Sequence, residues 1–242
     1  MVLRRRDPDL RYGGLVRRAN REVVPMDDSA LALERRVVAK GGTASVGDRN
    51  ADTFLFVAAG AGTISLGEAS ALTPRSAALV AAGEEARLDA GEDLELVVMT
   101  VGPGVDRHAP MGQRALTASL DDAEAQRATG ARSFQILFDA SNGSTRATLF
   151  AGFVPPGKAP RHYHLYDEIV WVPDGPGRLH LGESIEELGP GSAFRLRPRE
   201  VHIVENTSTD RELTIIGLFT PAGSPSAAYL KPDVAAEYRV SS

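Results

Sequence analysis

The chain has 242 residues, and at roughly 150 residues per domain this length predicts one or two domains, each able to bury its own core. Lysine and arginine number 27 against 32 aspartates and glutamates, which gives a formal net charge of −5, and 43% of the residues are hydrophobic. This balance argues against a dedicated nucleic-acid-binding protein and against a disordered chain. No cysteine is present, which excludes disulfides, thiolate metal sites and a cysteine nucleophile.

The sequence contains no apolar stretch that approaches the roughly 18 residues of a membrane span. Its arginine-rich beginning is not followed by the apolar segment that a signal peptide needs. We therefore expect a cytoplasmic protein that contacts neither membrane nor nucleic acid.

In chain order, we predict an N-terminal arm over 1–30, a first β domain over 31–102, a linker over 103–132, a second β domain over 133–222 and a tail over 223–242. Short apolar runs such as TFLFV, FQILF and EIVWV lie between glycine- and proline-containing turns. Evenly spaced runs of this kind predict an all-β sandwich or barrel.

The linker contains the only segment that we predict to be helical, Ala115 to Ala131. Thr117 or Ser119 would cap it, acidic residues follow in its first turn, and Gly130 would end it. Further along, the sequence Ser141-Asn142-Gly143-Ser144 predicts a tight hairpin, because Asn-Gly readily adopts positive φ angles.

An internal repeat relates the two β domains. The segment that starts at Gly62 aligns with the segment that starts at Gly177, an offset of 115 residues that becomes 116 after one insertion. Asp52 aligns with Asp167 at the same offset, and the turn glycines coincide. The sequence therefore predicts a duplicated barrel.

Only the second half carries a cluster of candidate metal-binding residues. His162 and His164 project to the same side of a strand, and the three residues after His164 allow a turn that brings Glu168 back beside them. His202, on a later strand, would complete the set. Imidazole nitrogens with one carboxylate suit a divalent first-row metal, namely Fe, Mn, Ni, Cu, Co or Zn.

The run His162-x-His164-x3-Glu168-x6-Gly175, followed by Gly191-x10-His202-x3-Asn206, resembles the two motifs of the cupin superfamily. This resemblance implies two tandem cupin barrels (double-stranded β-helix or jelly-roll) joined by a short helical linker. It also implies that His162, His164, Glu168 and His202 bind the metal, and that barrels pair into a homodimer.

The aligned positions of the first half serve as an internal control. Gly47, Arg49, Thr53 and Ala86 stand where the second half has its three histidines and Glu168. Since only Thr53 could bind an ion, and then weakly, we expect the first barrel to be metal-free.

Strand alternation predicts an apolar substrate pocket beside the metal. The residues on the side of the ligands are Val170, Val172, Phe194, Leu196 and Val204. Trp171 has the opposite parity and is expected to pack between strands or at an interface.

The function that this pattern favours is a metal-dependent enzyme for a small organic substrate, most plausibly a dioxygenase-type oxidoreductase in which Glu168 alternates between ligand and catalytic proton acceptor. One alternative is a hydrolase, isomerase or lyase, because ureidoglycine aminohydrolases have a similar layout with metal in the C-terminal barrel alone. Another is a cupin that binds a small molecule without catalysis. Tyr163 or Tyr166 could orient the substrate.

Overall fold

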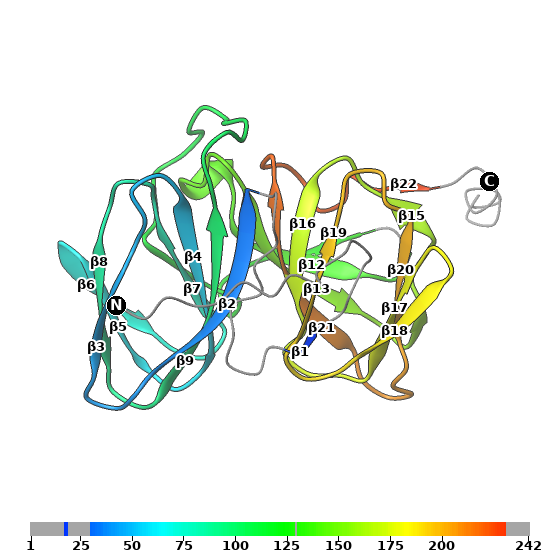
Figure 1. Cartoon of the computed structure of the whole chain (residues 1–242), viewed down its shortest axis with the longest axis horizontal. Coiled ribbons are helices and arrows are strands. Elements are labelled where there is room, and N and C mark those ends of the chain that lie inside the picture. The colour runs from blue at the N-terminus through cyan, green and yellow to red at the C-terminus, as the bar shows by residue number, and fades with distance from the viewer. Residues whose placement is uncertain (1–16, 19–29, 129, 231–242) are drawn as a thin grey trace, which may run out of the picture.

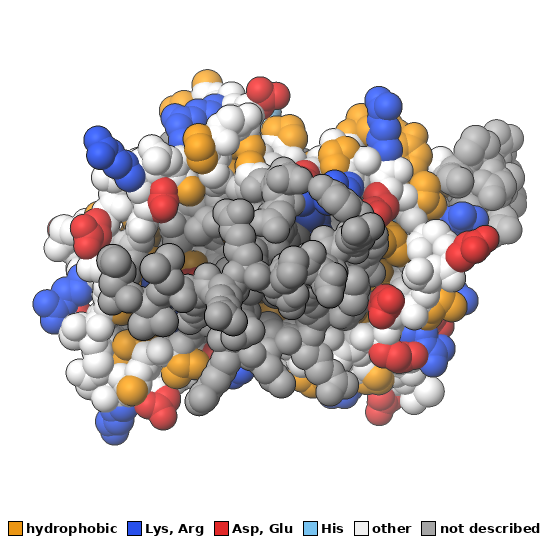
Figure 2. All heavy atoms as spheres, viewed as in Figure 1, with side chains coloured by type: hydrophobic (Ala, Val, Ile, Leu, Met, Phe, Trp, Pro, Cys, Tyr) orange, Lys and Arg blue, Asp and Glu red, His pale blue; other side chains and the backbone are white. Residues whose placement is uncertain are grey.

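The structure, a computed structural model, describes residues 17–18, 30–128 and 130–230. These residues form two β barrels that lie side by side (Figure 1). Acidic and basic side chains are interspersed on the face shown in Figure 2. No helix in the described ranges is long and apolar enough to cross a membrane.

The first barrel consists of a five-stranded and a four-stranded antiparallel sheet, in the orders β10-β7-β4-β9-β2 and β3-β8-β5-β6. Its strands are β2 (Leu31–Val38), β3 (Thr43–Val46), β4 (Asp52–Ala59), β5 (Gly62–Leu66), β6 (Glu68–Leu72), β7 (Ser76–Val80), β8 (Ala86–Ala90), β9 (Leu94–Val101) and β10 (Thr117–Ser119).

The second barrel consists of a seven-stranded sheet, in the order β1-β19-β16-β21-β13-β12-β11, and a six-stranded sheet, in which β18-β17-β20-β15-β22 are neighbours and β14 also pairs with β20. Its strands are β1 (Arg17–Arg18), β11 (Ala125–Arg127), β12 (Ser133–Phe138), β13 (Thr148–Val154), β14 (Gly157–Lys158), β15 (His162–Tyr163), β16 (Asp167–Trp171), β17 (Gly177–Leu181), β18 (Ser184–Leu188), β19 (Ser192–Leu196), β20 (His202–Asn206), β21 (Leu213–Thr220) and β22 (Tyr229–Leu230).

The predicted duplication is present in the strand order. The succession β7-β4-β9-β2 in the first barrel corresponds to β19-β16-β21-β13 in the second, and β6-β5-β8 corresponds to β18-β17-β20. The register agrees as well, because Thr53 pairs with Val80 as Glu168 pairs with Leu196. The all-β, two-barrel expectation is therefore confirmed.

The two larger sheets share a core between the barrels. Phe54 and Phe56 of β4 point into this shared core, whereas Leu55 and Val57 fill the interior of the first barrel. Both faces of the strand are buried, which explains the uninterrupted apolar run TFLFV. Trp171 of β16 lies in the shared core, 6.1 Å from Phe56 between ring centroids, as its parity predicted.

The helix predicted over 115–131 is wrong. This segment instead supplies two edge strands, β10 to the first barrel and β11 to the second, joined by a turn at Ser119. The side-chain amide of Gln135 donates to the carbonyls of Leu120 (3.0 Å) and Ala123 (2.5 Å), two acceptors that a helix would have used for its own hydrogen bonds. Contacts with both barrels thus override the local helix signals.

The hairpin predicted around Asn142-Gly143 exists, since β12 pairs with β13, but its connection is wider than a two-residue turn. It contains the short 3-10 helix η1 (Ala140–Asn142), which Asp139 caps. Gly143 ends this helix with a φ of 109°, a conformation that favours glycine.

Candidate metal site in the second barrel

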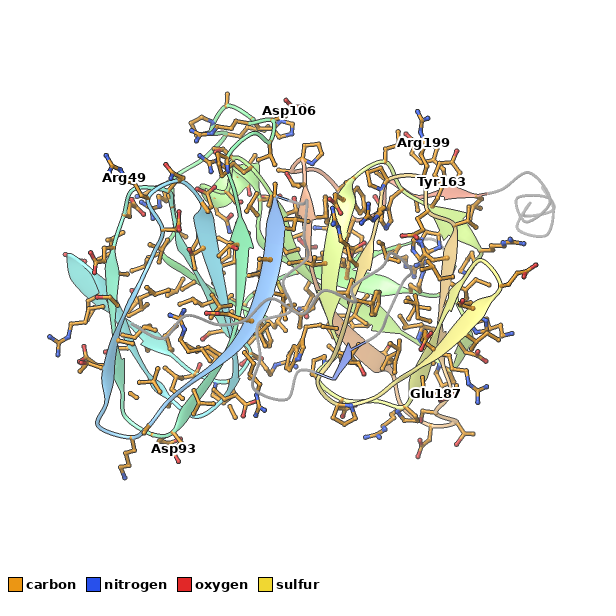
Figure 3. All side chains as sticks on the ribbon, viewed as in Figure 1. Arg49, Asp93, Asp106, Tyr163, Glu187 and Arg199 are labelled. Atoms are coloured by element: carbon orange, nitrogen blue, oxygen red, sulfur yellow. The ribbon has the colours of Figure 1, made fainter. Side chains whose placement is uncertain are left out.

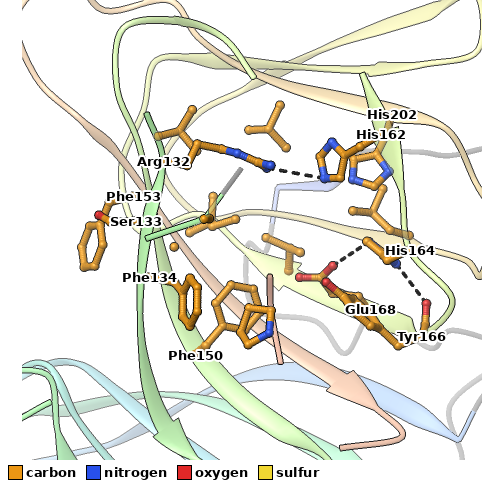
Figure 4. A pocket seen from close by; sticks show the side chains of 18 of the residues that line it. Arg132, Ser133, Phe134, Phe150, Phe153, His162, His164, Tyr166, Glu168 and His202 are labelled. Carbon is orange, nitrogen blue, oxygen red and sulfur yellow. Dashed lines mark hydrogen bonds and ion pairs between the residues drawn. The ribbon is translucent and has the colours of Figure 1, made fainter. Parts of the chain in front are cut away.

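The second barrel brings together the four residues that the motif singled out (Figure 4). His162 of β15 pairs directly with His202 of β20, and His164 follows β15. Glu168 enters from β16, in the opposite sheet. All four side chains are buried, with exposed fractions between 1% and 5%.

The three imidazoles share one hydrogen-bonding arrangement. Their Nδ1 atoms lie 2.7 Å from the carbonyl oxygen of Pro160, 3.1 Å from that of Tyr166 and 2.9 Å from that of Glu200, for His162, His164 and His202 in turn. Because a carbonyl only accepts, each Nδ1 carries the hydrogen. A neutral ring then has a lone pair at Nε2, the form in which histidine binds a metal.

Burial keeps two of these rings neutral. It lowers the pKa of His162 to about 4, and the positive guanidinium of Arg132 acts in the same direction. Burial also lowers the pKa of His202 well below its usual value, with added contributions from His162 and His164. Desolvation disfavours the charged imidazolium, so neither ring must lose a proton before it can bind a cation at neutral pH.

His164 carries the most informative contact of the site. Its Nε2 lies 2.9 Å from Oε2 of Glu168, yet the geometry is not that of a hydrogen bond, and this buried nitrogen has no hydrogen-bond partner in the described part of the chain. A nitrogen lone pair and a carboxylate oxygen repel each other at this distance. A cation placed beside both atoms would turn this repulsion into attraction.

The ring spacings agree with a shared ion. Because a bound imidazole nitrogen lies about 2.1 Å from the metal, the centroids of two rings on one ion are at most about 6.5 Å apart. The centroid separations are 4.4 Å for His162–His202, 5.0 Å for His164–His202 and 6.4 Å for His162–His164. The last value is at the upper end of this range, and among the described residues no three His, Asp or Glu side chains are yet arranged to hold an ion. The donor set fits a metal in chemistry and approximate position, and its side chains must draw closer around one.

Residues 150–219, which include all four side chains, match the family Cupin_2, the cupin domain. The fold of the whole chain resembles a point mutant of Bacillus subtilis oxalate decarboxylase, with a TM-score of 0.70 and 15% identity over 91% of this chain and 76% of that chain. The second barrel thus contains a cupin domain, and the chain as a whole has the fold of a two-barrel cupin.

Two further cupin-fold structures are similar. One is a putative glyoxylate-induced protein from Pseudomonas aeruginosa, with a TM-score of 0.67 and 16% identity over 80% of this chain and 74% of that chain. The other is a second structure of the B. subtilis decarboxylase, described by its Mn(II) centres, with a TM-score of 0.68 and 14% identity over 84% and 71% of the two chains. No curated protein matches the sequence.

The cupin site opens into a small cavity of about 60 Å³. Four of the five residues predicted for a substrate pocket, Val170, Phe194, Leu196 and Val204, line it. Val172 does not, and packs instead in the barrel core next to these residues. The remaining wall comes from the seven-stranded sheet and its neighbours, mainly Phe134, Phe150, Gly152, Phe153, Val154 and Ile215.

Tyr166 and Tyr163, which were considered together from the sequence, have different surroundings. Tyr166 lines the cavity, and its ring stacks between His164 and Phe219 with centroid distances of 4.0 Å to each. Tyr163 stacks on Tyr229 at 5.4 Å and does not line the cavity. Of the two, only Tyr166 packs against a histidine of the candidate site.

Arg132 is the charged residue of the cavity that sequence reasoning missed. It lies just before β12, in the segment predicted to be a linker, and its Nη1 is 3.4 Å from Nε2 of His162 (Figure 4). No motif marks this position. Its place in the cavity could have been predicted only if residues 125–138 had first been assigned to two strands of the second barrel.

The first barrel has a corresponding cavity of about 240 Å³ with a different lining. Thr53 lies there in the place of Glu168, and Val46, not Gly47, pairs with Ala86 as His162 pairs with His202. Arg49 is exposed and projects from the rim of the barrel (Figure 3). None of the residues that line this cavity is a histidine.

Proposed function

We propose that the second cupin barrel binds one divalent transition metal through His162, His164, Glu168 and His202, and that this site is the active site of an enzyme for a small organic molecule. The observation that carries the proposal is the buried Nε2 of His164, which lies beside the Glu168 carboxylate and has no hydrogen-bond partner among the residues that the structure describes. The Nδ1 atoms of all three histidines are each bonded to a backbone carbonyl, which leaves Nε2 as the metal-binding atom. The first barrel, which lacks this set, is proposed to be metal-free.

Within the proposed site, the metal would polarise a bound oxygen or carbonyl group and, if it is redox-active, exchange electrons. Nitrogen and oxygen donors of this kind accept Fe, Mn, Ni, Cu, Co and Zn. The Mn(II) centres of the similar decarboxylase are consistent with this range.

The protein side chains would supply proton transfer, positioning and exclusion of water. Glu168, buried and close to His164, is placed to accept a proton from a substrate in the cavity. Burial raises the pKa of Tyr166 above its usual value, so its hydroxyl stays protonated while its ring orients His164. The phenylalanine and valine walls give a low local dielectric, which strengthens the effect of any charge in the site.

Metal content tests this assignment directly. We expect protein reconstituted with Mn(II) or Fe(II) and then desalted to retain about one ion per chain by elemental analysis, and we expect His164→Ala and His202→Ala to retain almost none. His180→Ala is the matched control, because His180 lies on the neighbouring strand β17, pairs with Glu205 of β20 (2.6 Å) and does not line the cavity. Retention of the ion by both ligand variants would overturn the proposal.

For the reaction type, we propose dioxygenase-type chemistry, with metal-dependent hydrolysis, isomerisation or lyase chemistry as the alternative. The alternative takes its support from the likeness in fold to oxalate decarboxylase, because a decarboxylase is a lyase. Turnover under strict exclusion of dioxygen separates the two, because activity that persists without dioxygen excludes the oxygenase. Homodimerisation also remains a prediction, which sedimentation can test.

A further inference from the structure

A short segment near the end of the described chain forms part of the cavity wall of the second barrel. Residues 221–230 lead from β21 in the seven-stranded sheet to β22, which pairs with β15 in the six-stranded sheet. In Figure 1 this segment runs along the upper end of the barrel, and we call it the C-terminal strap. Pro225, in its middle, lines the same cavity as the candidate metal ligands. The strap therefore joins the two sheets beside the candidate site.

The beginning of the strap is anchored by three hydrogen bonds. The hydroxyl of Thr148, a fully buried residue, donates to the carbonyl of Gly223 (2.9 Å), and the N–H of Gly223 donates to the same hydroxyl oxygen (3.0 Å). The Nε2–H of His108 donates to the carbonyl of Ala222 (2.6 Å), which is itself buried. This end is thus tied to β13 and to the loop between β9 and β10.

The far end of the strap is held by fewer contacts. β22 has two residues, Tyr229 opposite Tyr163 and Leu230 opposite His162, and within the described ranges β15 is its one neighbour. The rings of Tyr163 and Tyr229 stack with centroids 5.4 Å apart and planes 15° apart, but Tyr229 is 47% exposed. A short edge strand with exposed contacts can open locally while the rest of the domain stays folded.

The middle of the strap is hydrogen-bonded to itself. Residues 224–228 are serine, proline and alanine, and their hydrogen bonds to other described residues stay within the strap. The N–H of Ala227 donates to the carbonyl of Ser224 (3.0 Å), and the N–H of Ala228 donates to that of Ser226 (2.8 Å). Of the strap residues, Pro225 alone lines the cavity. This turn can therefore move as a unit and keep its own hydrogen bonds.

The other walls of the cavity are harder to displace. Phe134, Phe150 and Phe194 belong to β12, β13 and β19, and each of these strands has a neighbour on both sides. The turn between β11 and β12 is closed by a hydrogen bond from the N–H of Ala128 to the carbonyl of Arg132 (2.9 Å). Because the four candidate ligands are only 1–5% exposed, part of the wall must move before a molecule can reach them. The strap has the fewest bonds to break.

We propose that the C-terminal strap is the gate of the second-barrel cavity. β22 leaves β15, the strap swings about its anchored beginning at Ala222 and Gly223, and the stack of Tyr163 on Tyr229 is the latch that keeps it closed. This inference deepens the proposed function, since such a gate would admit the metal and the substrate. Its physical content is the access of small molecules to three buried imidazoles, which can be measured without a metal.

An engineered disulfide across the latch tests the gate. Since the chain has no cysteine, the double variant Tyr163→Cys, Tyr229→Cys contains a single pair of thiols, at positions directly opposite each other in antiparallel strands and within reach of a disulfide. Metal-free protein would be treated with diethyl pyrocarbonate at neutral pH, and modification of His162, His164 and His202 followed by peptide mass spectrometry. We expect these histidines to react about tenfold more slowly, or slower still, in the oxidised variant than in the same variant reduced and alkylated.

Two comparisons make the result specific. Arg178→Cys, Glu187→Cys places a disulfide between opposite residues of β17 and β18 that do not line the cavity, and its oxidation is expected to leave the rates unchanged. Tyr229→Ala removes the latch without a new bond and is expected to raise the rates about two- to tenfold, the effect expected of one aromatic pair. His180, which lies outside the cavity, serves as the internal reference in every protein.

Melting temperature and manganese content, measured on every variant, distinguish failure of the gate from failure of the metal site. Equal rates in the oxidised and alkylated forms, or protection no greater than that from the control disulfide, would overturn the gate. If the disulfide does not form, an unchanged rate in Tyr229→Ala overturns it. In each of these cases, retained manganese leaves the metal site standing. Protection of the histidines in a protein that retains no manganese would support the gate and overturn the metal site.

Discussion

At the scale of single residues, the site depends on three backbone carbonyls that fix which nitrogen of each histidine is free. Each carbonyl belongs to a residue two positions away from its histidine, at Pro160, Tyr166 and Glu200. The local chain therefore fixes the tautomer of each ring and restrains its orientation in the metal-free protein.

The pH dependence of the metal-free protein follows from the same rings. In the folded state the pKa of His162 is lowered to about 4 and that of His202 is lowered as well, whereas in the unfolded chain both are near 6.5. Below pH 6.5 the unfolded chain thus binds more protons, so the free energy of unfolding should fall between about pH 7 and pH 4, by on the order of 3 kcal/mol for His162.

Denaturant unfolding of EDTA-treated protein at several pH values measures this loss. The variants His162→Gln and His202→Asn cannot take up the proton and should show a shallower decline than the wild type. An equal decline in all three proteins would contradict the assignment of these buried neutral rings.

The motif identified the four metal-site candidates, but the other residues of the cavity were harder to predict from the sequence. Spacing and strand alternation placed Val170, Phe194, Leu196 and Val204 correctly around it. Alternation also placed Val172 there, but beyond the end of β16 the chain leaves the cavity wall. Arg132 lies just before β12, in the segment expected to be a linker, and no motif marks its approach to His162.

At the scale of elements, one glycine in β21 makes room for the site. A Cβ atom at Gly217 would lie 2.4 Å from Phe150 Cε1 and 2.7 Å from Glu168 Oε1. Gly217 pairs with Val170, whereas the corresponding partner of Leu55 in the first barrel is Val98, which fills the interior. A glycine inside a strand is a signal for such close approach.

Gly217→Ala is therefore expected to push Glu168 and Phe150 aside, to lower metal affinity at least tenfold, and to cost about 1–3 kcal/mol of stability through overpacking. The matched control is Gly189→Ala, where an added Cβ would meet no atom within 4 Å and the change in stability should stay within about 0.5 kcal/mol. Calorimetric metal titration and urea unfolding measure both effects. Unchanged metal affinity in Gly217→Ala would show that Glu168 does not need this space.

The local signals of one segment predicted the wrong structure. Residues 115–131 carry capping and acidic residues typical of a helix, but β10 and β11 each add an edge strand to a different barrel. The hydrogen bonds from Gln135 that hold this segment come from a residue well outside it. Where both faces of a strand are buried, as in β4, the apolar run alone was sufficient to predict the strand.

At the scale of the whole molecule, a buried ion pair crosses between the barrels. Nε of Arg146, before β13, lies 3.7 Å from Oδ2 of Asp52 in β4, and the exposed fractions of the two side chains are 5% and 8%. Arg146 also donates to the carbonyl of Asn50 at 2.8 Å. Burial raises the pKa of Asp52, whereas a hydrogen bond from the backbone N–H of Ala82 (2.9 Å) and the charges of Arg107 and Arg114 lower it.

Arg146→Met should lower the free energy of unfolding by about 1–3 kcal/mol, because it removes the ion-pair partner of a buried carboxylate that keeps only its hydrogen bond from Ala82 and more distant charges. The double variant Asp52→Asn, Arg146→Met should lose less, since it removes the charge as well as its partner. Urea unfolding measures both. A double variant that is no more stable than Arg146→Met would show that the pair does not couple the barrels electrostatically.

The duplication was the most predictable feature of the molecule. Glycine turns and strand spacing recur at a constant offset, and β4 to β9 correspond in order and register to β16 to β21. Packing between the barrels was harder to predict from the sequence. The alternation of side chains along β16 shows that Trp171 faces away from Glu168, but it does not show that Trp171 contacts Phe56. The pairing of β1, near the beginning of the chain, with β19 had no sequence signal.

The central claim is that one metal ion lies among His162, His164, Glu168 and His202 and that the first barrel holds none. Anomalous diffraction from crystals of Mn- or Fe-reconstituted protein, collected on both sides of the metal absorption edge, tests it most directly. We predict one strong peak per chain, within bonding distance of the three Nε2 atoms and a Glu168 oxygen. A peak in the cavity around Thr53, or none near His164 in protein that contains stoichiometric metal, would contradict the account.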